Sequence, residues 1–183
     1  MPDKKVPEIV QFDTPLGEKV LRAVSKKIKA DEISNKENQK LIQDLQYALS
    51  IQPDGVGLSA PQIATNKRVF VINPDVYNNL SEILPADTVI KTIFINPEIT
   101  KISKDKKAME EGCLSVRPWY GKVKRASRAT VKAFDENGQE FEIEGRGLLA
   151  QAFQHEIDHL DGILFIDKAK DLKKMERPVE KDN

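Results

Sequence analysis

Apolar side chains recur at helical spacing near the start of the chain and predict two helices. The stretch PLGEKVLRAVSKKIK (15–29) opens with Pro15, a residue favoured in the first turn of a helix. Its expected apolar stripe is Leu16, Val20, Val24 and Ile28. Ser34 and Glu37 then form a capping box, which marks the beginning of a second helix. The apolar stripe of that helix is Leu41, Leu45, Ala48 and Leu49.

The middle of the chain contains runs of β-branched residues that predict strands. After the turn sequence PDG (53–55), RVFVINP (68–74) and VIKTIFINP (89–97) are each expected to stop at Asn-Pro. The stretch DVYNNLSEILPAD (75–87) between them is expected to be a loop. Over residues 128–145, RATVKAF and QEFEIEG are joined by DENG, and Asn-Gly supports the positive φ angles of a hairpin turn.

From Gly147 the apolar period becomes helical again. The apolar face of this third helix is Leu149, Phe153, Ile157 and Leu160. A polar C-terminal tail is expected from about residue 172. The order helix, helix, strands, hairpin, helix predicts an α+β fold, and residues 1–183 are expected to form one domain because no linker or repeat divides them.

The composition narrows the classes of protein that the chain can belong to. Its 29 acidic and 29 basic side chains cancel, so no net charge attracts it to nucleic acid or membranes. A single cysteine excludes an internal disulfide and indicates a reducing compartment. The N-terminus has no apolar signal segment, and no apolar run reaches the length of a membrane span. We therefore expect a cytoplasmic protein.

Both histidines lie in QHEIDHLDG (154–162), four residues apart. On a helix His155 and His159 face the same side and can hold one metal ion, while Glu156 can reach a water beside it. The alternative is a surface pair on an amphipathic helix. The preceding pattern is that of a buried helix, which favours ligation because buried imidazoles need partners.

A catalytic zinc-type site has three protein ligands and one open position. Since both histidines are used, Cys113 in EEGCLSV is the strongest candidate for the third ligand. The alternative is that this cysteine is a small buried apolar side chain. Leu114 and Val116 are expected to seat the segment as an edge strand. Downstream acidic residues are the other candidate ligands, namely Asp167, Asp171 and Glu176.

Three segments together resemble the motifs of a known family. GVGLSAPQ (55–62), EGCLSV (111–116) and QHEIDHLDG (154–162), in this order and at these separations, resemble the signature motifs of peptide deformylases. Members of that family remove the N-formyl group from the initiator methionine of nascent polypeptides. The resemblance implies antiparallel or mixed sheets packed around a central helix that carries the histidine pair. The metal ligands that it implies are Cys113, His155 and His159.

The resemblance also implies the metal and the roles of other residues. The expected ion is Fe²⁺, with Zn²⁺, Ni²⁺ or Co²⁺ as substitutes. Glu156 is the implied catalytic base, and the Gln62 amide and the Leu114 backbone N–H are the implied donors to an oxyanion. The expected substrate-binding residues are Val56, Gly57, Gly112, Leu114 and Phe153, the last two of which can equally be core.

Charged and aromatic residues near the motifs are candidates for supporting roles. Glu111 is a candidate acceptor for a histidine N–H. Asp158 can pair with Arg125 or Arg128, and the alternative for these charges is solvation. Trp119 and Tyr120 follow the second motif and either contact the substrate or pack against the protein.

The expected partners are N-formylmethionyl nascent peptides, with transient contact to the ribosome. We expect a monomer with no nucleic-acid motif and no membrane association. Two other classes of protein carry a similar histidine pair. A metalloendopeptidase would need a downstream third ligand and a larger cleft, whereas a binding module without enzymatic activity would use the pair structurally.

Overall fold

The structure is a computed structural model that describes residues 6–78 and 90–175. Its strands are β1 (Gly57–Ser59), β2 (Val69–Ile72), β3 (Ile93–Ile102), β4 (Lys106–Gly112), β5 (Trp119–Ala126), β6 (Arg128–Phe134), β7 (Glu140–Arg146) and β8 (Lys170–Lys174). Its α-helices are α1 (Pro15–Leu21), α2 (Lys36–Ser50), α3 (Asp75–Asn78) and α4 (Leu148–Leu160). Short 3-10 turns cover Ala30–Glu32, Ala60–Ile63 and Phe165–Asp167.

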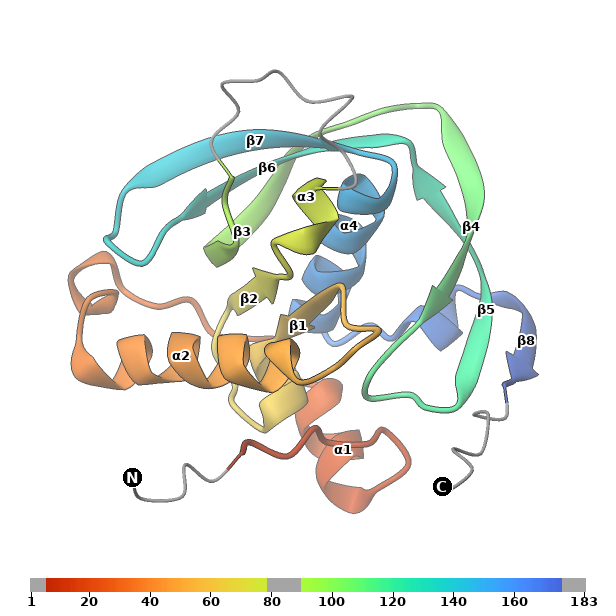
Figure 1. The fold of residues 1–183 in the computed structure, drawn as a ribbon, viewed down its shortest axis with the longest axis horizontal. Helices are drawn as coiled ribbons and strands as arrows, with labels where there is room; N and C mark the ends of the chain where they lie inside the picture. The colour runs from red at the N-terminus through yellow and green to blue at the C-terminus, as the bar shows by residue number, and fades with distance from the viewer. Residues whose placement is uncertain (1–5, 79–89, 176–183) are drawn as a thin grey trace, which may run out of the picture.

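The strands form two antiparallel sheets, and this confirms the prediction of an α+β fold (Figure 1). One sheet has the order β1-β2-β3-β6-β7, and the other has the order β4-β5-β8. The hairpin predicted over residues 128–145 is present as β6 and β7, with Gly138 at a positive φ of 76° in its turn. The sheets leave β1 and β4 as edge strands.

Helix α4 packs against strands of both sheets. The apolar residues predicted for it are all buried, namely Leu149, Phe153, Ile157 and Leu160. They join a core that includes Phe70 and Phe94 from the larger sheet. Toward the smaller sheet, the Gln154 side chain accepts from the Ala126 N–H and donates to the Ala126 carbonyl, both at 3.0 Å. Apolar packing on one side and hydrogen bonds on the other fix the orientation of α4.

The first predicted helix is wrong beyond its opening turns. Helix α1 has 7 residues instead of 15, and Val24 in the expected apolar stripe is 67% exposed. The chain after α1 is held by distant backbone groups instead. The Ser25 N–H donates to the Leu160 carbonyl, and the Arg68 N–H donates to the Lys26 carbonyl, each at 2.8 Å. These tertiary hydrogen bonds override the local helical pattern.

Two boundaries also differ from the sequence prediction. Asn35 caps α2 in place of Ser34, because its side chain accepts from the Asn38 N–H at 2.8 Å. The apolar stripe predicted for this helix is buried as expected. Strand β3 does not stop at Asn-Pro, since Asn96 adopts a positive φ of 52° and the strand continues through an irregularity in the register.

Other differences concern segments that were expected to be irregular. The stretch 75–87 begins with α3, and the part from residue 79 lies outside the described residues. Residues 170–174 form β8 against β5, within and beside the start of the expected polar tail. Cys113 follows the end of β4 and does not lie in an edge strand. Within the described ranges, no helix combines the length and apolar character that a membrane crossing requires.

Candidate metal centre

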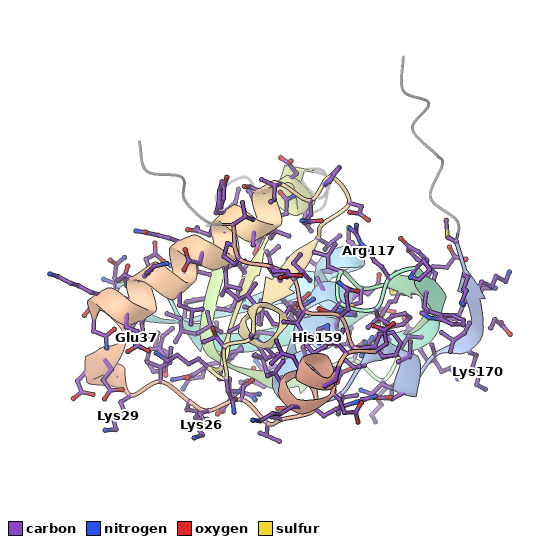
Figure 2. All side chains as sticks on the ribbon, turned by 90° about the horizontal axis from the view of Figure 1, so that it is seen from below. Lys26, Lys29, Glu37, Arg117, His159 and Lys170 are labelled. Carbon is purple, nitrogen blue, oxygen red and sulfur yellow. The ribbon has the colours of Figure 1, made fainter. Side chains whose placement is uncertain are left out.

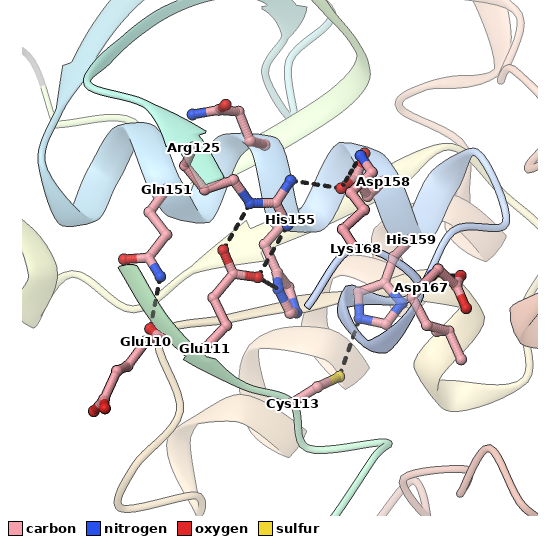
Figure 3. A network of polar contacts seen from close by, with 12 residues as sticks. Glu110, Glu111, Cys113, Arg125, Gln151, His155, Asp158, His159, Asp167 and Lys168 are labelled. Atoms are coloured by element: carbon pink, nitrogen blue, oxygen red, sulfur yellow. Dashed lines mark hydrogen bonds and ion pairs between the residues drawn. The ribbon is translucent and has the colours of Figure 1, made fainter. Parts of the chain in front are cut away.

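Three side chains from two separate parts of the chain converge, two of them from α4 and one from the segment that follows β4. The potential ligand atoms of Cys113, His155 and His159 all lie within 4.8 Å of one another (Figure 3). The Cys113 sulfur is 3.1 Å from Nε2 of His159, and the two imidazole ring centres are 4.9 Å apart. Ligands around one zinc-sized ion are separated by roughly 3.5 Å, given metal–ligand bonds of about 2.0–2.3 Å. The donor set therefore fits a single metal ion.

The neighbouring charges favour a cation at this point. Burial and the nearby His155 lower the pKa of His159, so its ring stays in the neutral form that binds metals. Burial also tends to lower the pKa of His155, but its contacts with Cys113 and Glu111 raise it above the ordinary value. These contacts stabilise positive charge on the His155 ring next to the Cys113 sulfur. A bound metal ion would place positive charge at the same point.

The His155 ring is oriented by a buried chain of charges (Figure 3). Its Nδ1 lies 3.0 Å from Oε2 of Glu111. Arg125 donates to both oxygens of the same carboxylate, at 2.6 Å to Oε1 and at 2.9 Å to Oε2. Arg125 donates in addition to Asp158 at 2.6 Å, and Lys168 binds the same carboxylate at 2.7 Å. Of the two arginines considered for Asp158, the structure thus selects Arg125 and not Arg128.

The Glu111 carboxylate is kept ionised within this chain. Burial raises its pKa, but hydrogen bonds from Arg125 and His155 outweigh burial and lower the pKa to about 2. A permanent acceptor at Nδ1 leaves the other ring nitrogen of His155 for a ligand.

Glu156 is buried beside the ligands but belongs to a different environment. Its side chain is 3% exposed, and its Oε2 has no hydrogen-bond partner among the described residues. Burial raises its pKa to about 7, so the carboxylate can exchange a proton near neutrality. Space at this carboxylate requires Gly57, because a Cβ atom there would lie 2.8 Å from Oε1 of Glu156.

The Gln62 amide is held with one defined orientation. Its Oε1 accepts from the backbone N–H and the hydroxyl of Ser59, both at 2.8 Å. Its Nε2 therefore faces the metal ligands and lies 3.6 Å from the Cys113 sulfur. No role was predicted for Ser59 from the sequence, although a serine three residues before a glutamine is a recognisable capping pattern.

A cavity of about 200 Å³ adjoins these residues. Of the expected substrate-binding residues, it is lined by Val56, Gly57, Gly112 and Leu114. Phe153 is fully buried in the core, with its ring centre 5.1 Å from that of Phe94, and is not among the lining residues. Its expected place at the wall is therefore corrected, because α4 turns this side chain toward the larger sheet.

The cavity also contains residues that the sequence did not single out for binding. These are Asp54, Glu110, Arg117, Leu148, Gln151 and Ala152. Gln151 and Leu148 could have been found, because they precede His155 by one and two helical turns. No sequence pattern identified Asp54, whereas Arg117 begins the stretch RPWYG (117–121) after the second motif, which was expected at the rim of the substrate site. Of the aromatic pair considered at the rim, Tyr120 lines the cavity, whereas Trp119 packs in an apolar cluster.

The acidic alternatives for the third ligand lie elsewhere. Asp167 forms an ion pair with Arg22, and Asp171 lies in β8. Glu176 is outside the described residues. Within the described chain, the group of potential ligands around the two histidines contains Cys113 and no carboxylate. An antiparallel α+β fold with this thiol-imidazole set defines a metal-dependent class of protein.

Comparisons with known proteins agree with this class. The polypeptide deformylase family model matches residues 6–175. A peptide deformylase of Halothermothrix orenii is 44% identical over 153 residues, which cover 84% of this chain and 89% of the relative. The solved peptide deformylase of Ehrlichia chaffeensis has a TM-score of 0.77 and 31% identity, covering 91% of this chain and 89% of its own. The one from Legionella pneumophila has a TM-score of 0.75 and 36% identity, covering 91% and 87%.

The chain belongs to the polypeptide deformylase family. Members of this family are metal-dependent hydrolases that remove the N-formyl group from nascent polypeptides, and the chain is an enzyme of this kind.

Proposed function

We propose that this enzyme hydrolyses the formyl amide of N-formylmethionyl peptides with Fe²⁺ held by Cys113, His155 and His159. Zn²⁺, Ni²⁺ or Co²⁺ can take the place of iron. When bound, the ion supplies positive charge that polarises the formyl group and lowers the pKa of a nearby water. The convergence of the three ligands is the observation that carries this proposal.

Glu156 is the proposed general base. Its carboxylate takes a proton from the attacking water and later gives it to the departing amine, so formate and a free N-terminus are produced. Its burial and its pKa of about 7 support both transfers near neutral pH. In this account α4 is the central motif helix of the family, and it holds the base next to the ligand His155.

Two donors are proposed for the negative oxygen that develops on the formyl carbon. One is Nε2 of Gln62, which Ser59 aims toward the site. The other is the backbone N–H of Leu114. The carbonyl of this residue accepts a hydrogen bond from the Gln11 side chain at 3.0 Å, which helps to fix the backbone there. Donors fixed before the reaction stabilise such a charge without reorganisation.

The peptide is proposed to bind as an added strand. Strands β1 and β4 are both sheet edges, and residues of each line the cavity. An extended peptide can hydrogen-bond to such an edge while its first side chain enters the cavity. Val56, Gly57, Gly112 and Leu114 then contact the substrate. Gly112 leaves room for the Tyr120 ring in the wall of the cavity, because a Cβ there would lie 2.4 Å from that ring.

Glu111, Arg125 and Asp158 are proposed to position His155 without contacting the substrate. We further propose a single catalytic domain over residues 1–183. The protein would act as a cytoplasmic monomer with transient contact to the ribosome, where its substrates emerge.

One assay separates this function from its alternatives. Protein purified without oxygen is incubated with formyl-Met-Ala-Ser and with unformylated Met-Ala-Ser. Release of formate from the first peptide alone is expected. Cleavage of an internal peptide bond would indicate a metalloendopeptidase, and no reaction from metal-loaded protein would indicate a binding module. Elemental analysis of the same preparation tests iron.

A further inference from the structure

Arg117 and Asp54 form an ion pair in the wall of the cavity. Their Nη2 and Oδ1 atoms are 2.6 Å apart, and both residues line the same cavity as His155 and Glu156. They come from different parts of the chain. Asp54 precedes β1, whereas Arg117 lies in the segment that connects Cys113 to β5. The pair therefore connects two walls of the substrate site.

Arg117 is also the only lysine or arginine among the described residues that line the cavity. The acidic residues there have different surroundings. Glu111 is neutralised by Arg125, whereas Glu110 lies exposed opposite Lys122 of the neighbouring strand. Apart from the proposed metal ion, a carboxylate on a bound peptide can thus find a lysine or arginine partner among the described lining residues only at Arg117.

The ion pair is open enough for its partners to exchange. The side chain of Asp54 is 54% exposed and that of Arg117 is 23% exposed. Ion pairs with this access to water contribute little to stability. A carboxylate of the substrate can therefore take the place of the Asp54 side chain at Arg117 with little loss of free energy. Nη2 of Arg117 also donates to Oε1 of Gln52 at 3.5 Å, and this second contact helps to hold the guanidinium next to the cavity.

We propose that Arg117 determines specificity for the part of the peptide beyond the formylmethionine. It binds an acidic side chain at the second, third or fourth residue of the substrate, and this carboxylate replaces Asp54. Asp54 competes for the same guanidinium and limits the preference. The inference rests on the proposed function, since it assumes that formylated peptides occupy the cavity.

The test uses formyl-Met-Ala-Ala-Ala-amide and three variants with Asp at position 2, 3 or 4. The amide removes the terminal carboxylate, so only the Asp side chain supplies negative charge. For the wild type we expect kcat/KM to be about two- to fivefold higher with Asp at one of these positions. Arg117→Gln should remove the preference, so that kcat/KM becomes equal within about twofold for the Asp peptides and the neutral peptide, and Asp54→Asn should enlarge the preference.

Lys27→Gln is the matched control. This substitution also removes one positive charge and one exposed ion pair, that of Lys27 with Glu98. Lys27 does not line the cavity. Its neighbours Lys26 and Lys29 are labelled at the lower left of Figure 2, whereas Arg117 is labelled right of centre. This variant should keep the wild-type preference.

Three results would overturn the inference. They are an unchanged preference in Arg117→Gln, an equal loss on all four peptides in that variant, and no preference at any position in both the wild type and Asp54→Asn. Failure of the proposed function would look different, because the wild type would then release no formate even from the neutral peptide.

Discussion

On one side of α4, Phe153 packs between aromatic rings of the larger sheet, whereas on the other side His155 is hydrogen-bonded to Glu111. Phe153 and Glu111 are buried, and the His155 side chain is 12% exposed where it meets the cavity. The apolar side is stabilised by burial itself, with the Phe94 and Phe153 ring centres 5.1 Å apart. The charged side is tolerated only because its groups are paired. The apolar side therefore serves stability, and the charged side serves the metal.

The largest effect is expected at the proposed general base Glu156, whose Oε2 has no hydrogen-bond partner among the described residues. Glu156→Ala should lower kcat by a factor of about 10² to 10⁴, because the proton acceptor is lost. The variant should still bind one metal ion per chain, since Glu156 is not a ligand in this account. Steady-state kinetics with elemental analysis checks both. Glu140→Gln, an exposed acid in β7, is the control, and an active Glu156→Ala would remove the general base.

Removing the cation from the buried network should cost nearly as much. Arg125→Met leaves the buried Glu111 charge without its guanidinium partner, so the free energy of unfolding should fall by about 3–5 kcal/mol. Because Arg125 no longer holds Glu111, the acceptor for His155, in place, metal binding should also weaken by about 10- to 100-fold. Denaturant unfolding and chelator competition measure the two effects. Arg125→Lys keeps the charge and should lose less stability and less metal affinity. Wild-type stability in Arg125→Met would contradict the view that the charged side of α4 is tolerated only because its groups are paired.

A substitution on the apolar side should separate stability from the metal. Phe153→Leu removes an aromatic partner of Phe70 and Phe94 and should lower the free energy of unfolding by about 1–3 kcal/mol. Metal stoichiometry should stay unchanged, because the side chain points away from the ligands. A loss of metal as large as that of Arg125→Met would mean that the two sides of α4 are not independent.

The smallest effect is expected at an exposed ion pair, which provides a reference for the buried one. Burial raises the pKa of Asp167, but hydrogen bonds from Arg22 and the Leu164 N–H lower it below the ordinary value of 3.8. A lowered pKa adds stability above the unfolded value, and this stability is lost as the pH falls through the folded value. Asp167→Asn should therefore cost less than about 1 kcal/mol at neutral pH and almost nothing at low pH. Unfolding at several pH values tests this, and a difference that grows on acidification would contradict it.

The sequence predicted the elements whose signals are local. The apolar period of α4, the strand β2 and the β6–β7 hairpin are present as expected. The three proposed ligands also lie close together, although Cys113 and His155 are 42 residues apart in the sequence. This proximity was predictable only from the resemblance to the family.

Features that depend on distant partners were not predictable in the same way. The helical pattern beyond α1 is overridden by hydrogen bonds such as that from Ser25 to Leu160. Asn96 continues a strand through Asn-Pro because its amide bonds the backbone of Ile28. Phe153 could be core or cavity wall on its own helix, and only the position of the larger sheet decides between them.

X-ray absorption at the metal edge of the anaerobically purified enzyme tests the central claim most directly. We expect one sulfur and two imidazole nitrogen neighbours at the metal, at about 2.3 Å and about 2.0–2.1 Å in the zinc-substituted enzyme. Cys113→Ala should lose the sulfur signal together with most of the bound metal. A spectrum without sulfur, or one that this substitution leaves unchanged, would contradict it.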